Sequence, residues 1–495
     1  MNNKIIILLG LLLSFASCSL LWEDLDVENE NAPDLDDVYS NPEEYPALLT
    51  GAYRVWWNSA IGQNPALALG VGAEQICSGY GSWGMRTFNT IPRVPIDNRE
   101  GDIVIQPEAG GWYGFYPVVG TVNNIIKKIE HEGVEVIING EDRTAMVLAN
   151  AYFLQGTAYG HLGLLYDQAF LITDVDIPAD FEYVFTPYKS IMEFALERID
   201  RAIEIAETNT FQAEQMMPGV NMSNEYLGKV ANSTAARMLV AASRTPQEDS
   251  SIDWARVKRY AEKGIDTNFF VYAQVGWQGL AANIRDTTNP LHIMEWDWVR
   301  VSQRVISLMA PNDPIGTYPR PEGVHEYPEA ENPVDHRLLT DMTYAGQHGN
   351  WNPASLGFHI LGEYKYTRYR ESFSVPGVGN IDFLLKAEND LLLAEAEIRT
   401  GGDLQKAASL INNTRVERGK MSAMTGGNSS SELLDAVMHE RYVELIATFM
   451  PLTYFDRRRT GTLIDGTAWH FPIPAQELTI HKLPIYTFGG KGNEM

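Results

Sequence analysis

The chain has little cysteine and little positive charge. Cys18 and Cys77 are its only cysteines among 495 residues, so at most one disulfide could form and stability must come from a packed core. The sequence has 38 Lys and Arg against 64 Asp and Glu, a formal charge of −26. An acidic chain lacks the cations that neutralise phosphates, which argues against nucleic acid as a partner. It also argues against attachment to anionic lipid through a polybasic surface.

Long apolar runs are also scarce, and the first one has the features of an export signal. Lys4 precedes an apolar run at residues 5–13, and small residues then lead directly to Cys18. The run is too short to span a bilayer, which favours a signal peptide over a transmembrane helix. A cysteine at the cleavage point predicts a lipoprotein signal peptide at residues 1–17 with Cys18 as the lipid anchor. An ordinary secretory signal followed by an incidental cysteine is the alternative.

Lipidation of Cys18 would provide stable attachment to a membrane. Several acyl chains, including palmitate, at about 0.8 kcal/mol per buried CH₂ anchor a protein where a single chain does not. The residues that follow are polar and acidic, with Glu23, Asp24 and Asp26 close together. We therefore predict a disordered acidic tether at residues 18–40. If Cys18 is lipidated, Cys77 has no disulfide partner.

A helical period returns several times in the remaining chain. Asn41-Pro42 has the composition of a helix start, and Asp253 is placed to cap a later helix. Small and apolar residues recur at helical spacing on successive segments, which is what closely packed helix pairs require. The predicted helical scaffold covers residues 41–57, 120–267 and 381–460. Its helices read as three or four tetratricopeptide-like pairs without a clean 34-residue register.

Two stretches, residues 58–119 and 268–380, interrupt this pattern. They are rich in Gly, Pro, Asn and aromatic residues and show no sustained helical period. Long irregular segments inside a compact protein are usually functional or disordered, and so many aromatic residues argue against disorder. We predict that these stretches form an irregular layer of loops and short strands that carries the ligand site.

Five short motifs occur in order in the last quarter of the chain. Residues 382–397, 411–418, 440–445, 456–458 and 471–474 read DFLLKAENDLLLAEAE, INNTRVER, ERYVEL, DRR and FPIP. This ordered series, together with the lipoprotein-like start, resembles the RagB/SusD family of outer-membrane nutrient-binding lipoproteins.

The resemblance implies a mostly α, SusD-like fold with a single domain at residues 41–495. It also implies a lipid-anchored outer-membrane protein facing outside the cell, which holds an oligosaccharide for a SusC-like TonB-dependent transporter. Three alternatives are a peptide ligand, as in the RagB-like branch, a protein–protein adaptor and a glycoside hydrolase. The segment after Leu445, with Thr448-Phe449-Met450-Pro451, departs from the family pattern and indicates a divergent branch.

Aromatic residues framed by glycine or asparagine are the candidates for ligand contact. Sugar rings offer apolar faces and hydroxyl edges, so a glycan site needs aromatic faces beside polar side chains. Small neighbours favour exposure of an aromatic ring on a loop, although each ring could instead fill the core. The candidates are Tyr80, Trp83, Arg86, Trp277, Trp296, Trp298 and Trp351.

The sequence gives weaker support for an enzyme. The sequence contains no G-x-S-x-G, no H-E-x-x-H and no P-loop, and the formal G-x-G-x-x-G at residues 79–84 lacks a strand–helix context. Glu295 and Asp297 fall on one face of a predicted strand, a spacing that a glycosidase could use. His325 and His336 lie near carboxylates, but no metal-ligand spacing is recognised. We therefore predict a binding protein that is not an enzyme and has no cofactor or metal.

The charged residues of the late motifs are predicted to be structural. Glu440 and Glu444 lie one helical turn apart, where an arginine can bind both carboxylates. Arg441, Asp456 and Arg457 belong to the same motif region. We expect these five side chains to hold the last helix against the chain that follows.

Overall fold

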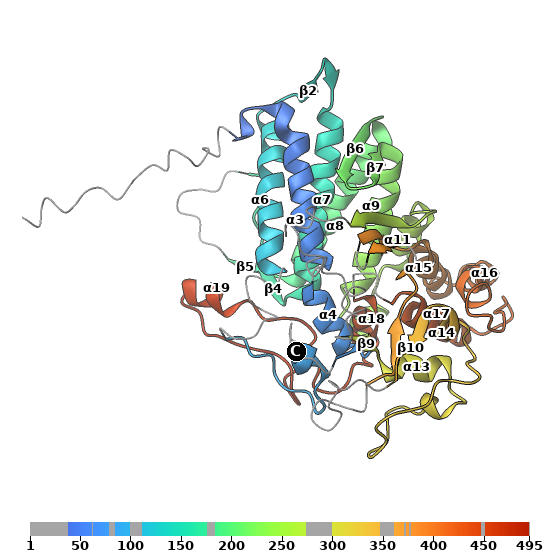
Figure 1. The fold of residues 1–495 in the computed structure, drawn as a ribbon. Helices are drawn as coiled ribbons and strands as arrows, with labels where there is room; N and C mark the ends of the chain where they lie inside the picture. Colours follow the sequence, from blue (N-terminus) through green and yellow to red (C-terminus); the bar gives the residue numbers. More distant parts are fainter. Residues whose placement is uncertain are drawn as a thin grey trace, which may run out of the picture. The chain divides into compact units, whose positions relative to one another are not determined.

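The computed structural model describes most of the chain after its first 37 residues. Helices dominate this part and the strands are short (Figure 1), so the prediction of a mostly α fold is confirmed. Contacts from residue 43 onward form one compact unit. The described residues are 38–61, 63–78, 85–99, 111–175, 184–273, 299–346, 361–370, 373–375, 378–446 and 451–494.

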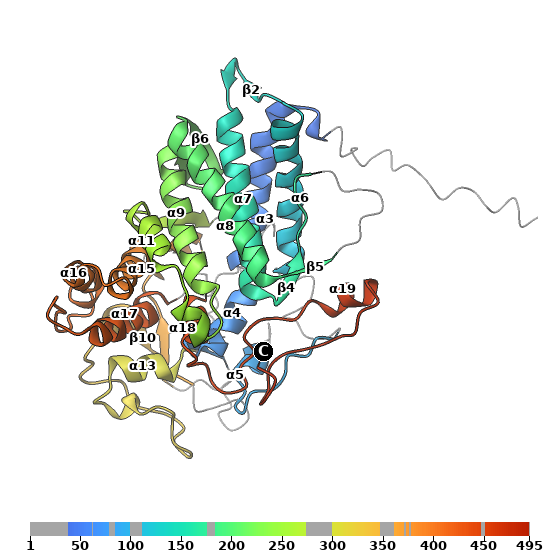
Figure 2. The same ribbon diagram turned by 180° about the vertical axis from the view of Figure 1, so that it is seen from behind.

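Four long helices stand side by side (Figures 1 and 2). They are α3 (Tyr45–Ile61), α6 (Trp112–Ile126), α7 (Thr144–Leu165) and α8 (Tyr188–Thr208). Helix α7 contacts the other three and is buried along nearly its whole length. A Cβ added at Gly156 would lie 2.7 Å from the carbonyl oxygen of Ala195, and one at Gly160 would lie 2.2 Å from the sulfur of Met238. The small residues of α7 therefore permit the close helix contacts that the sequence predicted.

Further helices extend this packing toward the C-terminus. Helix α9 packs on α8 and α11, α11 packs on α15, and α15 packs on α16 and α17. The stripes predicted on α8 and α9 face the core: Ile191, Ala195 and Leu227 are fully buried. The bounds are α9 (Asn224–Ala241), α10 (Pro246–Ser250), α11 (Trp254–Glu262), α15 (Lys386–Arg399), α16 (Leu404–Arg415), α17 (Ser430–Glu444) and α18 (Leu452–Arg459).

Side-chain caps fix several helix starts. The Asp253 carboxylate accepts a hydrogen bond from the Arg256 amide at 2.9 Å, as the sequence predicted for a cap of α11. Between α15 and α16 the chain turns at Gly401, whose φ of 67° favours glycine. Asp403 then caps α16 by accepting from the amides of Gln405 and Lys406.

The strands form small sheets at the edges of the helices. The largest is a three-stranded antiparallel sheet in the order β12 (Phe373–Val375), β13 (Val378–Leu384), β8 (Phe269–Ala273). A hairpin of β6 (Gln212–Met217) and β7 (Val220–Ser223) precedes α9. The other pairs are β1 (Ile76–Cys77) with β9 (Arg300–Val301), β2 (Ile137–Ile138) with β3 (Glu141–Asp142), β4 (Gln168–Phe170) with β5 (Phe185–Pro187), and β10 (Met342–Tyr344) with β11 (Tyr364–Tyr366).

Helices occupy part of the first stretch for which the sequence showed no helical period. Helix α3 runs on to Ile61 and is followed by α4 (Gln63–Gly72). Residues 66–72 are all buried, so α4 has no polar face and leaves no amphipathic stripe to detect. The remaining helices are η1 (Pro42–Glu44), α5 (Met85–Asn89), η3 (Lys127–His131), α13 (Gln303–Met309), η5 (Pro314–Gly316), α14 (Arg337–Thr340) and α19 (Ala475–Ile480).

Aromatic residues fill the core beside α6. Trp112, the first residue of α6, is 2% exposed and meets the rings of Tyr116 and Tyr166 at 5.1 and 5.0 Å between centroids. Cys77 is a free, fully buried thiol. Burial raises the pKa of Cys77 to about 12, so its thiol stays protonated and acts as a small core residue.

Candidate functional site

The aromatic candidates from the sequence fall outside the described residues. Arg86 alone lies in a described element, the short helix α5, and only its backbone is described. The candidates outside the described residues are Tyr80, Trp83, Trp277, Trp296, Trp298 and Trp351, and the proposed anchor Cys18 lies outside them as well.

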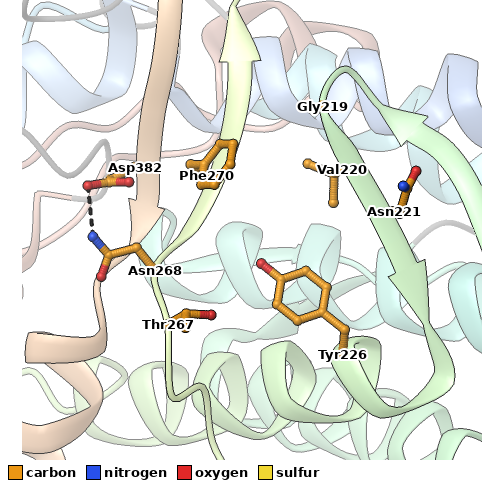
Figure 3. Close-up of a pocket in the computed structure, with 8 residues that line it drawn as sticks. All are labelled: Gly219, Val220, Asn221, Tyr226, Thr267, Asn268, Phe270 and Asp382. Carbon is orange, nitrogen blue, oxygen red and sulfur yellow. Dashed lines mark hydrogen bonds between the residues drawn. The ribbon is translucent and has the colours of Figure 1, made fainter. Parts of the chain in front are cut away.

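A pocket of about 740 Å³ opens beside the three-stranded sheet. Figure 3 shows that it is built from the β6–β7 hairpin, the start of α9, the beginning of β8 and strand β13. Strand β8 ends at Ala273, so the chain leads directly from this sheet into residues 274–298, which carry three of the candidate tryptophans. We call it the β8 pocket; its lining is Gly219, Val220, Asn221, Tyr226, Thr267, Asn268, Phe270 and Asp382.

The hairpin is held against β8 by backbone contacts. The Tyr272 amide donates to the carbonyl oxygen of Pro218 at 2.9 Å. Gly219 has a φ of 74°, and a Cβ there would lie 3.0 Å from the Tyr272 Cβ. Glycine at this turn therefore lets the hairpin approach the strand and shape one wall of the β8 pocket.

An amide and a carboxylate form the polar wall of the β8 pocket. The Asn268 Nδ2 donates to the Asp382 Oδ2 at 3.0 Å (Figure 3), while the Asn268 Oδ1 accepts from the Lys386 amide at 2.9 Å. Asp382 lies opposite Phe270 in the register of β13 and β8. Burial raises the pKa of Asp382, and the charge of Arg368 opposes this shift. The polar wall is thus fixed in place by the sheet and by the start of α15.

Aromatic rings form the apolar side of the same pocket. Tyr226 projects from α9 into the space between the hairpin and β8, and Phe270 comes from β8 itself (Figure 3). Burial, with the charges of Asp266 and Asp382, raises the pKa of Tyr226 to about 12. Its hydroxyl therefore stays protonated near neutral pH and can donate a hydrogen bond. Two half-buried rings beside amide, hydroxyl and carboxylate groups can bind a sugar ring by stacking and by its hydroxyls.

Sequence reasoning did not find the β8 pocket. Its lining comes from three segments, around residues 219–226, 267–270 and 382, none of which has a local motif for a ligand. Only the pairing of β8 with β13 and the fold of the hairpin bring them together. No signal in the single sequence indicated this assembly.

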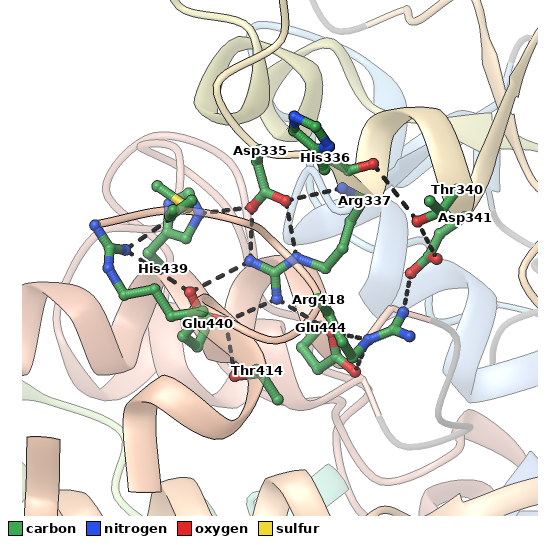
Figure 4. A network of polar contacts seen from close by, with 12 residues as sticks. Asp335, His336, Arg337, Thr340, Asp341, Thr414, Arg418, His439, Glu440 and Glu444 are labelled. Carbon is green, nitrogen blue, oxygen red and sulfur yellow. Dashed lines mark hydrogen bonds and ion pairs between the residues drawn. The ribbon is translucent and has the colours of Figure 1, made fainter. Parts of the chain in front are cut away.

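A buried ionic network lies elsewhere, around Arg337 (Figure 4). The guanidinium donates to Asp335 at 2.6 and 2.9 Å, to Glu440 at 2.7 and 3.2 Å, and to Glu444 at 3.1 Å. Arg337 is fully buried, and Thr414 donates a further hydrogen bond to Glu440 at 2.8 Å. The two motif glutamates of α17 are thus joined to the start of α14, about one hundred residues earlier in the chain.

The other charged residues of the late motifs connect α18 to its neighbours. Arg441 Nε donates to the Asp456 Oδ2 at 2.7 Å, and Arg457 binds Glu74 and the Ala73 carbonyl oxygen. Arg458 donates to the carbonyl oxygens of Leu164 and Ala241 at 3.0 and 2.7 Å. Leu164 is the second-last residue of α7 and Ala241 the last of α9, so Arg458 supplies partners to carbonyl groups at helix ends that have none within the helix.

Folding lowers the pKa of two carboxylates of the Arg337 network, those of Asp335 and Glu444. Burial by itself raises the pKa of Asp335, but hydrogen bonds from His439 and Arg337 outweigh it, so the pKa lies well below the usual range. Burial likewise raises the pKa of Glu444, and the charges of Arg368, Arg418 and Arg337 bring it below its ordinary value. Both groups therefore stay ionised in the folded protein.

We expect the free energy of unfolding to fall steeply in acid. A carboxylate whose pKa is depressed by folding stabilises the protein fully above its unfolded pKa of about 4, and this stabilisation is lost as the pH drops toward the folded pKa. Urea unfolding between about pH 7 and about pH 3.5 measures the slope. The Asp335→Asn variant should show a shallower acid slope than the wild type, and equal slopes would contradict this assignment.

The described residues hold no group of three or more His, Cys, Asp or Glu side chains arranged to bind a metal ion. In the same part of the chain, no helix has the length and apolar character needed to cross a membrane.

Comparison with known proteins shows similarity in structure. No protein-family model and no curated protein matches the sequence. A SusD superfamily protein from Parabacteroides distasonis superimposes with a TM-score of 0.62 at 14% identity, covering 89% of this chain and 97% of the other. A SusD-like carbohydrate binding protein from Bacteroides vulgatus gives 0.56 at 16% identity, covering 83% and 82%. A laminarin binding SusD-like protein gives 0.53 at 15% identity, covering 90% and 99%.

These matches define the fold. The chain has the SusD-like fold over most of its length. The resemblance seen in its C-terminal motifs is therefore confirmed for the fold. Solved proteins with the same fold include some described as carbohydrate binding or laminarin binding.

Proposed function

We propose that this protein is a cell-surface lipoprotein that captures nutrient oligosaccharides without cleaving them. It is anchored at Cys18 in the outer membrane, faces outside the cell, and delivers its ligand to a SusC-like TonB-dependent transporter. The observation that carries the proposal is the SusD-like fold across nearly the whole chain, shared with structures described as carbohydrate binding and laminarin binding. The lipoprotein-like start of the sequence is consistent with it.

The ligand site in this proposal combines the β8 pocket with the aromatic residues predicted from the sequence. The pocket supplies Tyr226 and Phe270 as rings and Asn268 with Asp382 as hydrogen-bonding groups. Trp277 follows β8 by only four residues, so oligosaccharide units bound along this edge could meet both. Such a site recognises repeated sugar units rather than a single charged group.

The chemistry of the site favours reversible capture. An aromatic contact contributes about 0.5–1.5 kcal/mol beyond its buried area, and a net hydrogen bond contributes about 0.5–1.5 kcal/mol. A few such contacts, after the cost of ordering the ligand, give affinities in the micromolar to millimolar range. A ligand held this weakly can be released to a transporter.

Truncation of the predicted aromatics tests the proposal. Trp83→Ala, Trp277→Ala and Trp351→Ala should leave the helical circular-dichroism signal and the melting temperature nearly unchanged. At least one of them should weaken binding of laminarin oligosaccharides or another glycan by about 1–3 kcal/mol, the size expected for a binding hot spot. Isothermal titration against a panel of oligosaccharides measures the affinity.

Trp112→Ala provides the matched control, because this tryptophan is buried at the start of α6. Its truncation should lower the free energy of unfolding by about 3–5 kcal/mol. If all three test variants behave like this control, the predicted aromatics belong to the core. If all three bind glycan as tightly as the wild type, the ligand site lies elsewhere.

A further inference from the structure

A second groove lies on the helical part of the protein, away from the residues that line the β8 pocket. It runs between α8, the C-terminal end of α9 and the segment from α10 to the start of α11, and it encloses about 580 Å³. These helices are neighbours in Figures 1 and 2, and none of the groove residues lines the β8 pocket. We call it the α8–α11 groove.

The floor of the α8–α11 groove is apolar. Met192 and Leu196 of α8 contribute side chains that are 4% and 3% exposed, and Leu239 of α9 and Ile252 before α11 are half-buried. The half-buried residues leave apolar surface accessible between the helices. An apolar floor of this kind gains free energy when a second apolar side chain covers it.

The rim of the groove carries uncompensated negative charge. Glu193 and Glu197 are exposed and lie one turn apart on α8, and among the described residues neither carboxylate forms an ion pair. Like charges at this spacing repel each other and destabilise a helix. Asp253 is exposed on the opposite side, at the start of α11. A cation between these walls would remove the repulsion.

The basic side chains of the groove are already paired. Lys189 lies 2.9 Å from Glu248, and Arg256 lies 2.7 Å from Asp200. Five carboxylates against these two cations leave a formal charge of −3 among the lining residues. The groove therefore presents acidic walls around an apolar floor.

We propose that the α8–α11 groove binds a basic segment of a partner protein. An apolar side chain of the segment covers Leu239 and Ile252, and a Lys or Arg side chain beside it pairs with Glu193 and Glu197. Alternating apolar and basic groups match both the floor and the rim, whereas an uncharged sugar would leave the carboxylates unpaired. This interaction is separate from oligosaccharide capture, since it uses none of the residues proposed for that site.

Fluorescence anisotropy with the full-length protein tests the proposal. The probe is a short fluorescein-labelled peptide with lysine and leucine on one helical face, and its counterpart carries glutamate in place of lysine. The lysine probe should bind and the glutamate probe should not. The double variant Glu193→Gln/Glu197→Gln should weaken binding of the lysine probe by about tenfold, and Leu239→Gln should weaken it without changing the melting temperature.

The double variant Glu322→Gln/Glu331→Gln is the matched control. It removes the same net charge at two exposed positions that do not line the groove, so it should bind the lysine probe as the wild type does. Equal loss in both double variants would mean that general acidity attracts the probe, and unchanged binding in the Glu193/Glu197 variant would also overturn the proposal. Glycan titration of the groove variant should give the wild-type affinity, so failure here is distinguishable from failure of the proposed oligosaccharide function.

Discussion

Arg337→Met is expected to lower the free energy of unfolding by about 3–5 kcal/mol, the usual cost of removing one partner from a buried ion pair. The substitution leaves Asp335, Glu440 and Glu444 buried without the guanidinium that binds all three. Methionine fills part of the volume, so the loss reports mainly the ion pairs with Arg337 that are removed. Urea unfolding at neutral pH measures the change.

The control for this experiment is Arg259→Met. Arg259 is exposed near the end of α11, and its replacement removes the same charge from the surface. Surface substitutions of this kind usually change stability by less than about 0.5 kcal/mol. A similar small loss for Arg337→Met would mean that the Arg337 network does not hold α17 against α14.

Cys18→Ala is expected to release the protein from the membrane completely. Without the thiol no acyl chain can be attached, and the acidic tether gives no electrostatic attraction to anionic lipid in its place. Washed membrane fractions should lose the variant, and palmitate labelling should disappear.

Cys77→Ala is the matched control, because Cys77 is buried in the fold and should not be acylated. This variant should sediment with the outer membrane like the wild type. A Cys18→Ala protein that still sediments and still labels with palmitate would contradict the lipoprotein assignment.

External protease should digest the wild-type protein on intact cells, and full protection would place it on the periplasmic side.

The sequence predicted the helical scaffold where its helices are amphipathic. The stripes on α8 and α9 and the cap at Asp253 follow from local spacing and local hydrogen bonding, which a single sequence contains. Helix α4 was missed because it is buried all round and has no stripe. Helix α7 is also buried along nearly its whole length, but its small residues at helical spacing indicated it, so a buried helix needs such a second local feature to be predicted.

Contacts between segments far apart in the chain were harder to predict from the sequence. The sequence predicted that an arginine could bind Glu440 and Glu444, but gave no means of choosing Arg337, which precedes Glu440 by 103 residues. The hydrogen bond between Asn268 and Asp382 in the β8 pocket could not be predicted either, because these residues are also far apart in the chain. The ligand aromatics and the anchor remain predictions, since they rest on composition and resemblance alone.

The most direct test of the account is a titration of the purified protein with oligosaccharides, followed by chromatography of the same mixture. We expect a saturable binding isotherm with at least one glycan and an unchanged oligosaccharide afterwards. Products that disappear in Glu295→Gln or Asp297→Asn would identify a glycoside hydrolase instead. Binding of peptides with no binding of any glycan would contradict the central claim.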